Sequence, residues 1–389
     1  MREALKGIRV LDFTRLLPGP LCSMYLADYG ADVVKVEDPQ MGDYARDMEP
    51  MLSGVGALYQ LLNRDKRSMT LNLGHEEARA AARKLIADAD VVLESFRPGV
   101  MRKFGLDYET MRELNPRLIY VSLTGYGQTG PYAKKAGHDL NFIGFTGLLH
   151  ETIHARGKAH AALPAVQIAD IGGGALHAVN AVLLALVKRG VSGEGAYLDV
   201  AMTDGVLPFM IPPLGYHLAG QESGVATFNP LTGSLACYDV YETRDGQWMA
   251  LGALEEKFWK RFCEVAEIVP RLPDHWAADK QAAIREDVSA YFQAHTRAEL
   301  VDRFAAEDVC LTPVLSIAEA MADPHMTERA AFWTRPDADA VTEIKNPLLD
   351  RAAADASFPP ARGLHTDEVL RAYGYEDDVL RDFRERGII

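Results

Sequence analysis

Short apolar runs alternate with segments of helical spacing along residues 1–130 of the chain. The runs are rich in valine, isoleucine and leucine, and the segments between them are rich in alanine and leucine. Strands that alternate with helices predict a parallel sheet covered by helices on both faces, so we expect an α/β fold. The expected strands are Ile8–Phe13, Asp32–Glu37, Val91–Glu94 and Leu118–Leu123, and the expected helices are Leu21–Asp28 and Glu76–Ala87.

A different pattern follows farther along the chain. Ala175–Lys188 has the spacing and composition of a long apolar helix. Tyr238–Tyr241 and Trp248–Leu251 are apolar runs joined by a turn with Gly246, which predicts a β-hairpin. Because two or three helices are expected over residues 255–306, this part predicts a second, smaller α+β domain.

The same pattern gives the domain boundaries. We expect residues 1–203 to form the first part of a large domain and residues 235–319 to form the small domain. The stretch 204–234 contains five Gly and four Pro, a composition typical of a linker. Residues 320–389 are expected to form a second irregular linker and a short closing helix over Asp367–Tyr373.

Composition narrows the class of protein. The 389 residues are 48% hydrophobic and 25% charged, values typical of a globular protein. A net charge of −14 argues against a general nucleic-acid or anionic-membrane partner. We expect a cytoplasmic protein, because the sequence has neither a signal-peptide pattern nor an uninterrupted apolar run of membrane-spanning length. The cysteines are too far apart for a disulfide framework or a cysteine zinc site: Cys22, Cys237, Cys263 and Cys310.

Two motifs carry competing interpretations. Gly125–Gly130 fits GxGxxG, but Pro131 follows it and no helical period begins there, so a glycine-rich loop is favoured over a dinucleotide site. Residues 150–160 fit HExxHxxGxxH, in which His150, His154 and His160 would bind zinc and the Glu would act as a base. The alternative is a polar loop with three solvated histidines, and these residues alone leave both interpretations open.

A third set of polar positions has glycine neighbours. His138 and Asp139 follow Gly137, Asp170 precedes three consecutive glycines, and Glu255 follows Gly252 by three residues. A carboxylate at a helix start is stabilised as an anion, which suits a base or a nucleophile, and the glycines would let a substrate approach the backbone. The alternatives remain open: Asp170 as a simple N-cap, His138 as a structural residue, and Glu255 as a solvated helix start.

These positions, together with Gly7–Pro20 and residues 30–37, resemble the class III CoA-transferase family, also called the CaiB/BaiF type. Several independent segments in the right order are more specific than any single motif. The resemblance implies a Rossmann-like large domain built from both ends of the chain, a small domain from its middle, and an interlocked-ring homodimer. It also assigns residues 150–160 to a variable loop. The further matching segments are Asn63–Arg67, Phe96–Gly99, Thr124–Pro131, Asp199–Gly205 and His365–Leu370.

The resemblance implies an acyl-CoA thioester as the substrate, with no cofactor and no metal. It implies catalytic roles for His138, Asp170 and Glu255, and a backbone N–H near Asp139 that binds the enolate oxygen. The implied CoA-binding residues are Leu16, Leu17, Leu71, Leu73, Ser95, Phe96, Arg97, Lys103, Phe104 and Lys134.

Two positions near the expected CoA phosphates depart from the family pattern. The family often has Arg, which helps to hold a CoA phosphate, where this chain has Asp38. It often has Lys where this chain has Gly74. The residues that hold the CoA phosphates therefore stay open, with Arg97, Lys103 and Lys134 as basic alternatives nearby.

The resemblance leaves a choice between two chemistries. His138, Asp170 and Glu255 match the racemase members, and Leu17 replaces a Gln typical of formyl-CoA transferases. We therefore interpret the chain as a 2-methylacyl-CoA racemase that moves the α-proton through an enolate, with His138 and Glu255 serving one face and Asp170 the other. The alternative is a CoA-transferase that moves CoA between carboxylic acids through an aspartyl-CoA thioester on Asp170.

Overall fold

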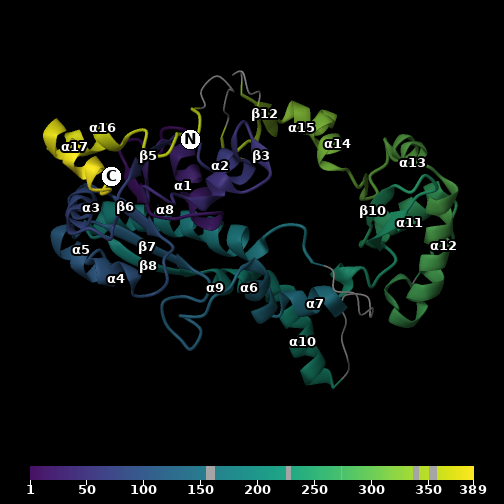
Figure 1. Ribbon diagram of the computed structural model, residues 1–389. Coiled ribbons are helices and arrows are strands. Elements are labelled where there is room, and N and C mark those ends of the chain that lie inside the picture. Colours follow the sequence, from purple (N-terminus) through teal and green to yellow (C-terminus); the bar gives the residue numbers. More distant parts are fainter. Residues whose placement is uncertain (155–162, 225–228, 273, 336–340, 350–356) are drawn as a thin grey trace. The chain divides into compact units, whose positions relative to one another are not determined.

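The structure is a computed structural model that describes residues 1–389 except 155–162, 225–228, 273, 336–340 and 350–356 (Figure 1). The chain divides into two compact units. Unit 1 comprises residues 1–146, 164–208 and 327–389, and unit 2 comprises residues 147–163 and 209–326. The division after residue 208 falls inside the stretch 204–234 for which the sequence predicted a linker.

Unit 1 is built on a six-stranded sheet in which every neighbouring pair of strands is parallel. The sheet order is β5-β2-β1-β6-β7-β8, which is the doubly wound order of a Rossmann fold. The predicted α/β class is therefore confirmed. The strands are β1 Arg9–Asp12, β2 Asp32–Glu37, β5 Lys66–Thr70, β6 Val91–Glu94, β7 Ile119–Thr124 and β8 Ala196–Ala201.

Helices cover both faces of this sheet. Leu11, Val34 and Val92 share one core with apolar residues of α3 (Glu76–Asp88). Neighbouring strand residues point to the opposite face, where α1 (Pro18–Asp28) and α8 (His177–Ser192) pack against each other and against the strands. The remaining elements of this unit are η1 Tyr44–Asp47, β3 Met51–Leu52, β4 Val55–Gly56, α2 Ala57–Leu62, α4 Val100–Phe104, α5 Tyr108–Leu114, α6 Asp139–Phe145, η2 Ala169–Leu176, α9 Met202–Val206, β12 Phe332–Thr334 and β13 Thr342–Ile344.

The C-terminal end of the chain completes the core of unit 1. Helices α16 (Thr366–Ala372) and α17 (Asp377–Glu385), yellow in Figure 1, add Leu370 and Phe383 to the core that α3 covers. The backbone N–H of His365 donates to the carbonyl of Ser68 in β5. The closing helix predicted over residues 367–373 is therefore present and belongs to the large unit.

Unit 2 contains a three-stranded sheet in the order β11-β10-β9. Strands β9 (Tyr238–Glu242) and β10 (Trp248–Gly252) pair antiparallel, which confirms the predicted hairpin. Helices pack on this sheet around a core that contains Trp259, Phe262 and Phe292. The remaining elements are α7 Leu148–His154, η3 Leu207–Met210, α10 Ile211–Ser223, η4 Pro230–Thr232, α11 Glu256–Ala266, η5 Asp274–Trp276, η6 Ala278–Lys280, α12 Gln281–Ala294, α13 Arg297–Phe304, β11 Leu311–Pro313, α14 Ile317–Ala322 and α15 Pro324–Glu328.

The stretch 204–234, which the sequence predicted as a linker, contains the helix α10 at its centre. Pro212 and Pro213 lie in the first turn of α10, where a missing N–H breaks no hydrogen bond of the helix. Gly224 ends the helix in a left-handed conformation, as glycine often does. Three of the residues that suggested a linker, Pro212, Pro213 and Gly224, are thus start and stop signals of a helix.

Among the described residues one helical stretch, Ala169–Ser192, is long and apolar enough to cross a membrane by length and composition alone. The sequence analysis found no apolar run of membrane-spanning length, because it counted only uninterrupted apolar residues. In the structure this stretch packs on α1, β7 and β8. Arg189 near its end is buried, with its guanidinium 2.9 Å from the Asp90 carboxylate. Because a helix that covers a sheet meets the same criteria, this stretch by itself assigns no membrane role.

Candidate active site

Polar residues such as Thr14, Arg15 and Asp38 follow the carboxyl ends of the parallel strands in unit 1. In a doubly wound sheet, ligands bind at this edge, where the strand order reverses. Here the reversal lies between β1 and β6. A cavity of about 290 Å³ opens there, lined by Phe13 and Arg15 after β1 and by Phe96 after β6. We call it the switch-point cavity.

His138, Asp139 and Asp170 form a second group of polar residues, which we call the acid–histidine cluster. His138 is the N-cap residue of α6, and its backbone N–H donates to the Asn141 side chain at 3.0 Å. One carboxylate oxygen of Asp139 accepts the backbone N–H groups of Ala169 at 2.6 Å and of Asp170 at 3.0 Å. Asp139 thus fixes the backbone that carries Asp170.

Asp170 is not the cap of its helix. It is the second residue of the π-helix η2, whose N-cap residue, Ile168, makes no side-chain capping bond. The carboxylate of Asp139 takes that capping role. The helix also begins before Ala175, where the sequence placed its start. Because π-helical turns occur often at functional sites, this local geometry marks Asp170 as more than a structural residue.

The pKa of Asp170 is raised to about 6, mainly because burial penalises its charge and further because Asp139 is nearby. The neighbouring His138 partly opposes this rise. The sequence had predicted that the helix start would favour the ionised form, and the structure shows the opposite direction. A carboxylate with a raised pKa is a stronger base while still ionised at neutral pH, which suits proton abstraction.

Two of the three glycines after Asp170, Gly173 and Gly174, serve packing. A Cβ on Gly173 would lie 2.5 Å from the carbonyl oxygen of Met202, and one on Gly205 would lie 2.0 Å from the carbonyl oxygen of Gly173. A Cβ on Gly174 would lie 2.9 Å from the Met202 side chain. Gly173 and Gly174 are therefore buried against α9. The sequence interpretation, in which these glycines face a substrate, is wrong for both of them.

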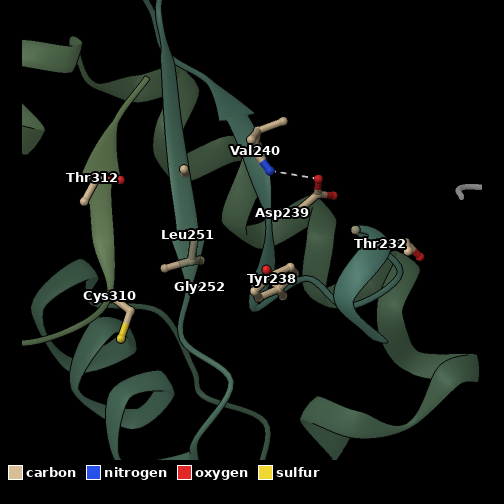
Figure 2. A pocket seen from close by; sticks show the side chains of 10 residues that line it. Thr232, Tyr238, Asp239, Val240, Leu251, Gly252, Cys310 and Thr312 are labelled. Carbon is tan, nitrogen blue, oxygen red and sulfur yellow. Dashed lines mark hydrogen bonds between the residues drawn. The ribbon is translucent and has the colours of Figure 1, made fainter. Parts of the chain in front are cut away.

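Glu255 belongs to unit 2. It is exposed at the start of α11, and its carbonyl oxygen accepts the N–H groups of Phe258 and Trp259. A cavity of about 380 Å³ in the same unit is lined by Tyr238, Leu251 and Cys310, among others, and Figure 2 shows these side chains around it. The pairing of Glu255 with His138, which is in unit 1, stays a prediction.

The predicted CoA-binding residues fall into three groups. Leu71, Leu73, Phe96 and Phe104 line the switch-point cavity. Arg97 and Lys134 line a neighbouring cavity of about 420 Å³ in the same unit. The others line neither cavity: Leu16, Leu17, Ser95 and Lys103.

Sequence reasoning missed two features of these cavities. Arg15 lines the switch-point cavity, with its guanidinium carbon 5.6 Å from the centre of the Phe96 ring. Glu94, in the neighbouring cavity, is buried, and its carboxylate accepts the N–H of Phe96 at 2.8 Å. Burial raises the pKa of Glu94 to about 7. A single acidic residue at the end of an apolar strand gave no signal of this environment in the sequence.

The glycine string 125–130 is a loop after β7, and the next helix of unit 1 begins only at Asp139. A Cβ on Gly125 would lie 2.3 Å from the Phe142 ring, so this glycine is needed for close packing. Gly127 and Gly130 adopt positive φ angles of 79° and 86°. The loop interpretation therefore agrees with the structure, which offers no helix N-terminus for a pyrophosphate here.

The described part of the zinc-like string, residues 150–154, lies on a helix where a polar loop was the alternative, because α7 spans Leu148–His154. The His150 and His154 rings lie one helical turn apart, with centroids separated by 4.0 Å. His160 lies outside the described residues. Within the described part of the chain, no group of three or more His, Cys, Asp or Glu side chains could hold a metal ion.

Comparisons with known proteins agree on one family. The family model of CoA-transferase family III matches residues 5–366. The alpha-methylacyl-CoA racemase of Mus musculus is 35% identical, covering 98% of this chain and 97% of the relative. The human succinyl-CoA:glutarate CoA-transferase is 27% identical, covering 100% and 90%. A CAIB/BAIF family protein from Brucella suis has a similar structure, with a TM-score of 0.78, 29% identity, and coverage of 96% of this chain and 100% of that chain.

Proposed function

Because the chain belongs to CoA-transferase family III, we propose that it acts on acyl-CoA thioesters as a 2-methylacyl-CoA racemase. Members of this family are enzymes, either racemases or CoA-transferases. The acid–histidine cluster carries the proposal, because it places a carboxyl group and an imidazole beside each other in unit 1. Two groups able to accept and donate protons are what a racemase needs.

The chemistry follows from the acidity of a thioester. The α-proton of an acyl-CoA can leave because the resulting carbanion delocalises to an enolate. Asp170 removes the proton from one face, and its raised pKa brings its basicity closer to that of the substrate carbon. His138 returns a proton to the other face. Asp139 positions Asp170 through the two backbone hydrogen bonds that it accepts.

A CoA-transferase is the second candidate. In that reaction Asp170 attacks the acyl-CoA carbonyl, which forms an acyl-aspartyl anhydride and releases CoA as a thiolate. The thiolate attacks the aspartyl carbonyl of the anhydride, which gives an aspartyl-CoA thioester and releases the donor acid. The acceptor carboxylate then attacks this thioester and releases CoA, and CoA attacks the acceptor carbonyl of the new anhydride to give the new acyl-CoA and free Asp170. The similarity to the human succinyl-CoA:glutarate CoA-transferase over the whole chain favours keeping this alternative. It assigns the covalent step to Asp170 and leaves His138 without an essential proton transfer.

Optical purity separates the two candidates. A single enantiomer of a 2-methylacyl-CoA is incubated with the enzyme, with and without an added carboxylic acid, and the product is analysed by chiral chromatography. If the enzyme is a racemase, the 2-methylacyl-CoA loses its optical purity even without the added acid. A thioester of the added acid, formed with the configuration of the donor unchanged, would contradict the racemase proposal and support the transferase.

The pH dependence of catalysis should follow Asp170. Because only the ionised carboxylate accepts a proton, kcat/KM is expected to rise with pH through about 6 and to be lost below that pH. The measurement is a pH–rate profile of the racemisation. Glu94→Gln provides the control, because Glu94 is another carboxyl group whose pKa is raised, to about 7. If Asp170 sets the acid limb of the profile, this variant should keep that limb near pH 6. An acid limb near the ordinary value of an aspartate, 3.8, would contradict this role.

We further propose an interlocked-ring homodimer that works in the cytoplasm without metal, cofactor, nucleic acid or membrane. An exposed apolar row on α8 supports a protein partner there: Leu184 is 70% exposed, Val187 70% and Val191 90%. Native mass spectrometry should give twice the chain mass of 42.8 kDa, with no added metal mass. A mass of one chain, or of a chain with bound zinc, would contradict these proposals.

A further inference from the structure

The switch-point cavity suits the adenosine end of a CoA thioester. It lies where the strand order of the Rossmann-like sheet reverses, which is where such folds bind nucleotides. Its walls include the rings of Phe13, Phe96 and Phe104, and aromatic walls stack well with a purine base. This placement rests on the proposed function, because it takes CoA as the ligand.

The charges of this cavity do not suit the 3′-phosphate of CoA. A phosphate monoester carries up to two negative charges near neutral pH and is usually held by Arg or Lys. Arg15 is the only cation among the lining residues, whereas Glu37, Asp38 and Asp43 are acidic. The two positions at which the sequence departs from the basic family pattern, Asp38 and Gly74, both line the cavity.

Backbone donors that follow Asp38, and the donor of Gly74, are already occupied. The Asp38 carboxylate accepts the N–H of Gln40 at 2.9 Å and that of Met41 at 2.8 Å. The side-chain oxygen of Asn72 accepts the N–H of Gly74 at 3.0 Å. Side chains of the protein thus take these backbone donors, and Asp38 adds a negative charge to the cavity.

Four other cations near the cavity have partners within the protein. Lys35 is buried 2.9 Å from Asp43 and also donates to the Thr14 carbonyl at 2.8 Å. Arg46 binds Glu37 at 2.6 Å. At the rim, Arg79 donates to the Leu73 and Gly74 carbonyls and pairs with Glu76, and Arg362 donates to the Gln40 carbonyl. None of these four lines the cavity.

We propose that this protein does not recognise the 3′-phosphate and therefore binds 3′-dephospho-CoA and its thioesters as well as it binds CoA and CoA thioesters. The ligand class is a pantetheine thioester carried on an adenosine diphosphate, with or without the 3′-phosphate. The basic residues Arg97 and Lys134 line the neighbouring cavity, where they remain available to the diphosphate. The structure thus separates recognition of the diphosphate from recognition of the 3′-phosphate.

Calorimetric titration of the full-length protein with CoA and with 3′-dephospho-CoA tests the proposal. We expect dissociation constants within about threefold of each other. Their ratio should stay nearly constant between low and high salt, because no ion pair with the 3′-phosphate is screened. CoA binding more than about thirtyfold tighter would overturn the inference and leave the CoA proposal intact. Failure of both ligands to bind would overturn the proposed function itself.

Charge reversal at one residue sharpens the test. Asp38→Arg places a cation in the cavity and should shift the ratio of the two affinities toward CoA by about tenfold. Asp279→Arg makes the same change of charge on an exposed residue of unit 2 and should leave the ratio unchanged. An unchanged ratio in Asp38→Arg would contradict the assignment of the 3′-phosphate end to this cavity.

Discussion

Replacing Asp170 by Ala should lower both racemisation and acceptor-dependent CoA transfer by about 10³-fold or more, because the carboxylate is the base of one reaction and the nucleophile of the other. The variant should still fold. Asp139 accepts hydrogen bonds from the backbone N–H groups of Ala169 and Asp170, and these donors survive the substitution. Steady-state kinetics with thermal unfolding of the same sample would separate loss of chemistry from loss of structure.

Two further variants serve as comparisons for Asp170→Ala. Asp170→Asn keeps the size of the side chain but removes its basicity, so it should be as inactive as Asp170→Ala. Glu151→Ala removes the acidic residue of the zinc-like string in unit 2 and should keep activity within a few-fold of the wild type. If Asp170→Ala retained more than about a tenth of the activity, Asp170 could be neither the base nor the nucleophile.

Replacing His138 by Ala should lower racemisation by about 10²-fold, because one of the two proton-transfer groups is lost. The same variant should affect CoA transfer much less, because that reaction depends on the carboxylate of Asp170. The comparison therefore reports which chemistry the cluster performs. Both activities are measured on one preparation, with His154→Ala as a control that removes an exposed histidine outside the cluster.

Two outcomes for His138→Ala would contradict the proposed mechanisms. Full acceptor-dependent CoA transfer by His138→Ala, with Asp170 converted to a hydroxamate when hydroxylamine cleaves its thioester, would replace the racemase proposal with the transferase. Loss of both activities in His138→Ala, with the fold intact, would give His138 a role beyond one proton transfer. The transferase mechanism written above would then be incomplete.

The sequence predicted the strands whose apolar runs are continuous, and it missed β5 and β8 of the large sheet. In β5 the reason is that polar residues are buried. Lys66 and Ser68 of β5 are buried because they are hydrogen-bonded inside unit 1. The lysine donates to the Pro20 carbonyl and to Asn63, and the serine donates to Glu37. Polar residues with buried partners do not give the apolar pattern that identifies a strand, so periodicity could not place β5.

The site could be predicted in part. His138, Asp139 and Asp170 were identified from glycine context and family resemblance, and the structure brings them together. The raised pKa of Asp170 could not be predicted, because it arises from burial and from Asp139, which is 31 residues away in sequence. The charge of the switch-point cavity also depends on tertiary structure, since Asp38 and Gly74 meet there only after folding.

Solvent deuterium exchange tests the central claim most directly. A single enantiomer of a 2-methylacyl-CoA is incubated with the enzyme in heavy water, with no acceptor acid present, and the recovered thioester is analysed by mass spectrometry and chiral chromatography. The account predicts one deuterium at the α-carbon, formed together with the opposite enantiomer and absent in Asp170→Ala. Recovery of the starting enantiomer without deuterium, followed by transfer of CoA once a carboxylic acid is added, would contradict it.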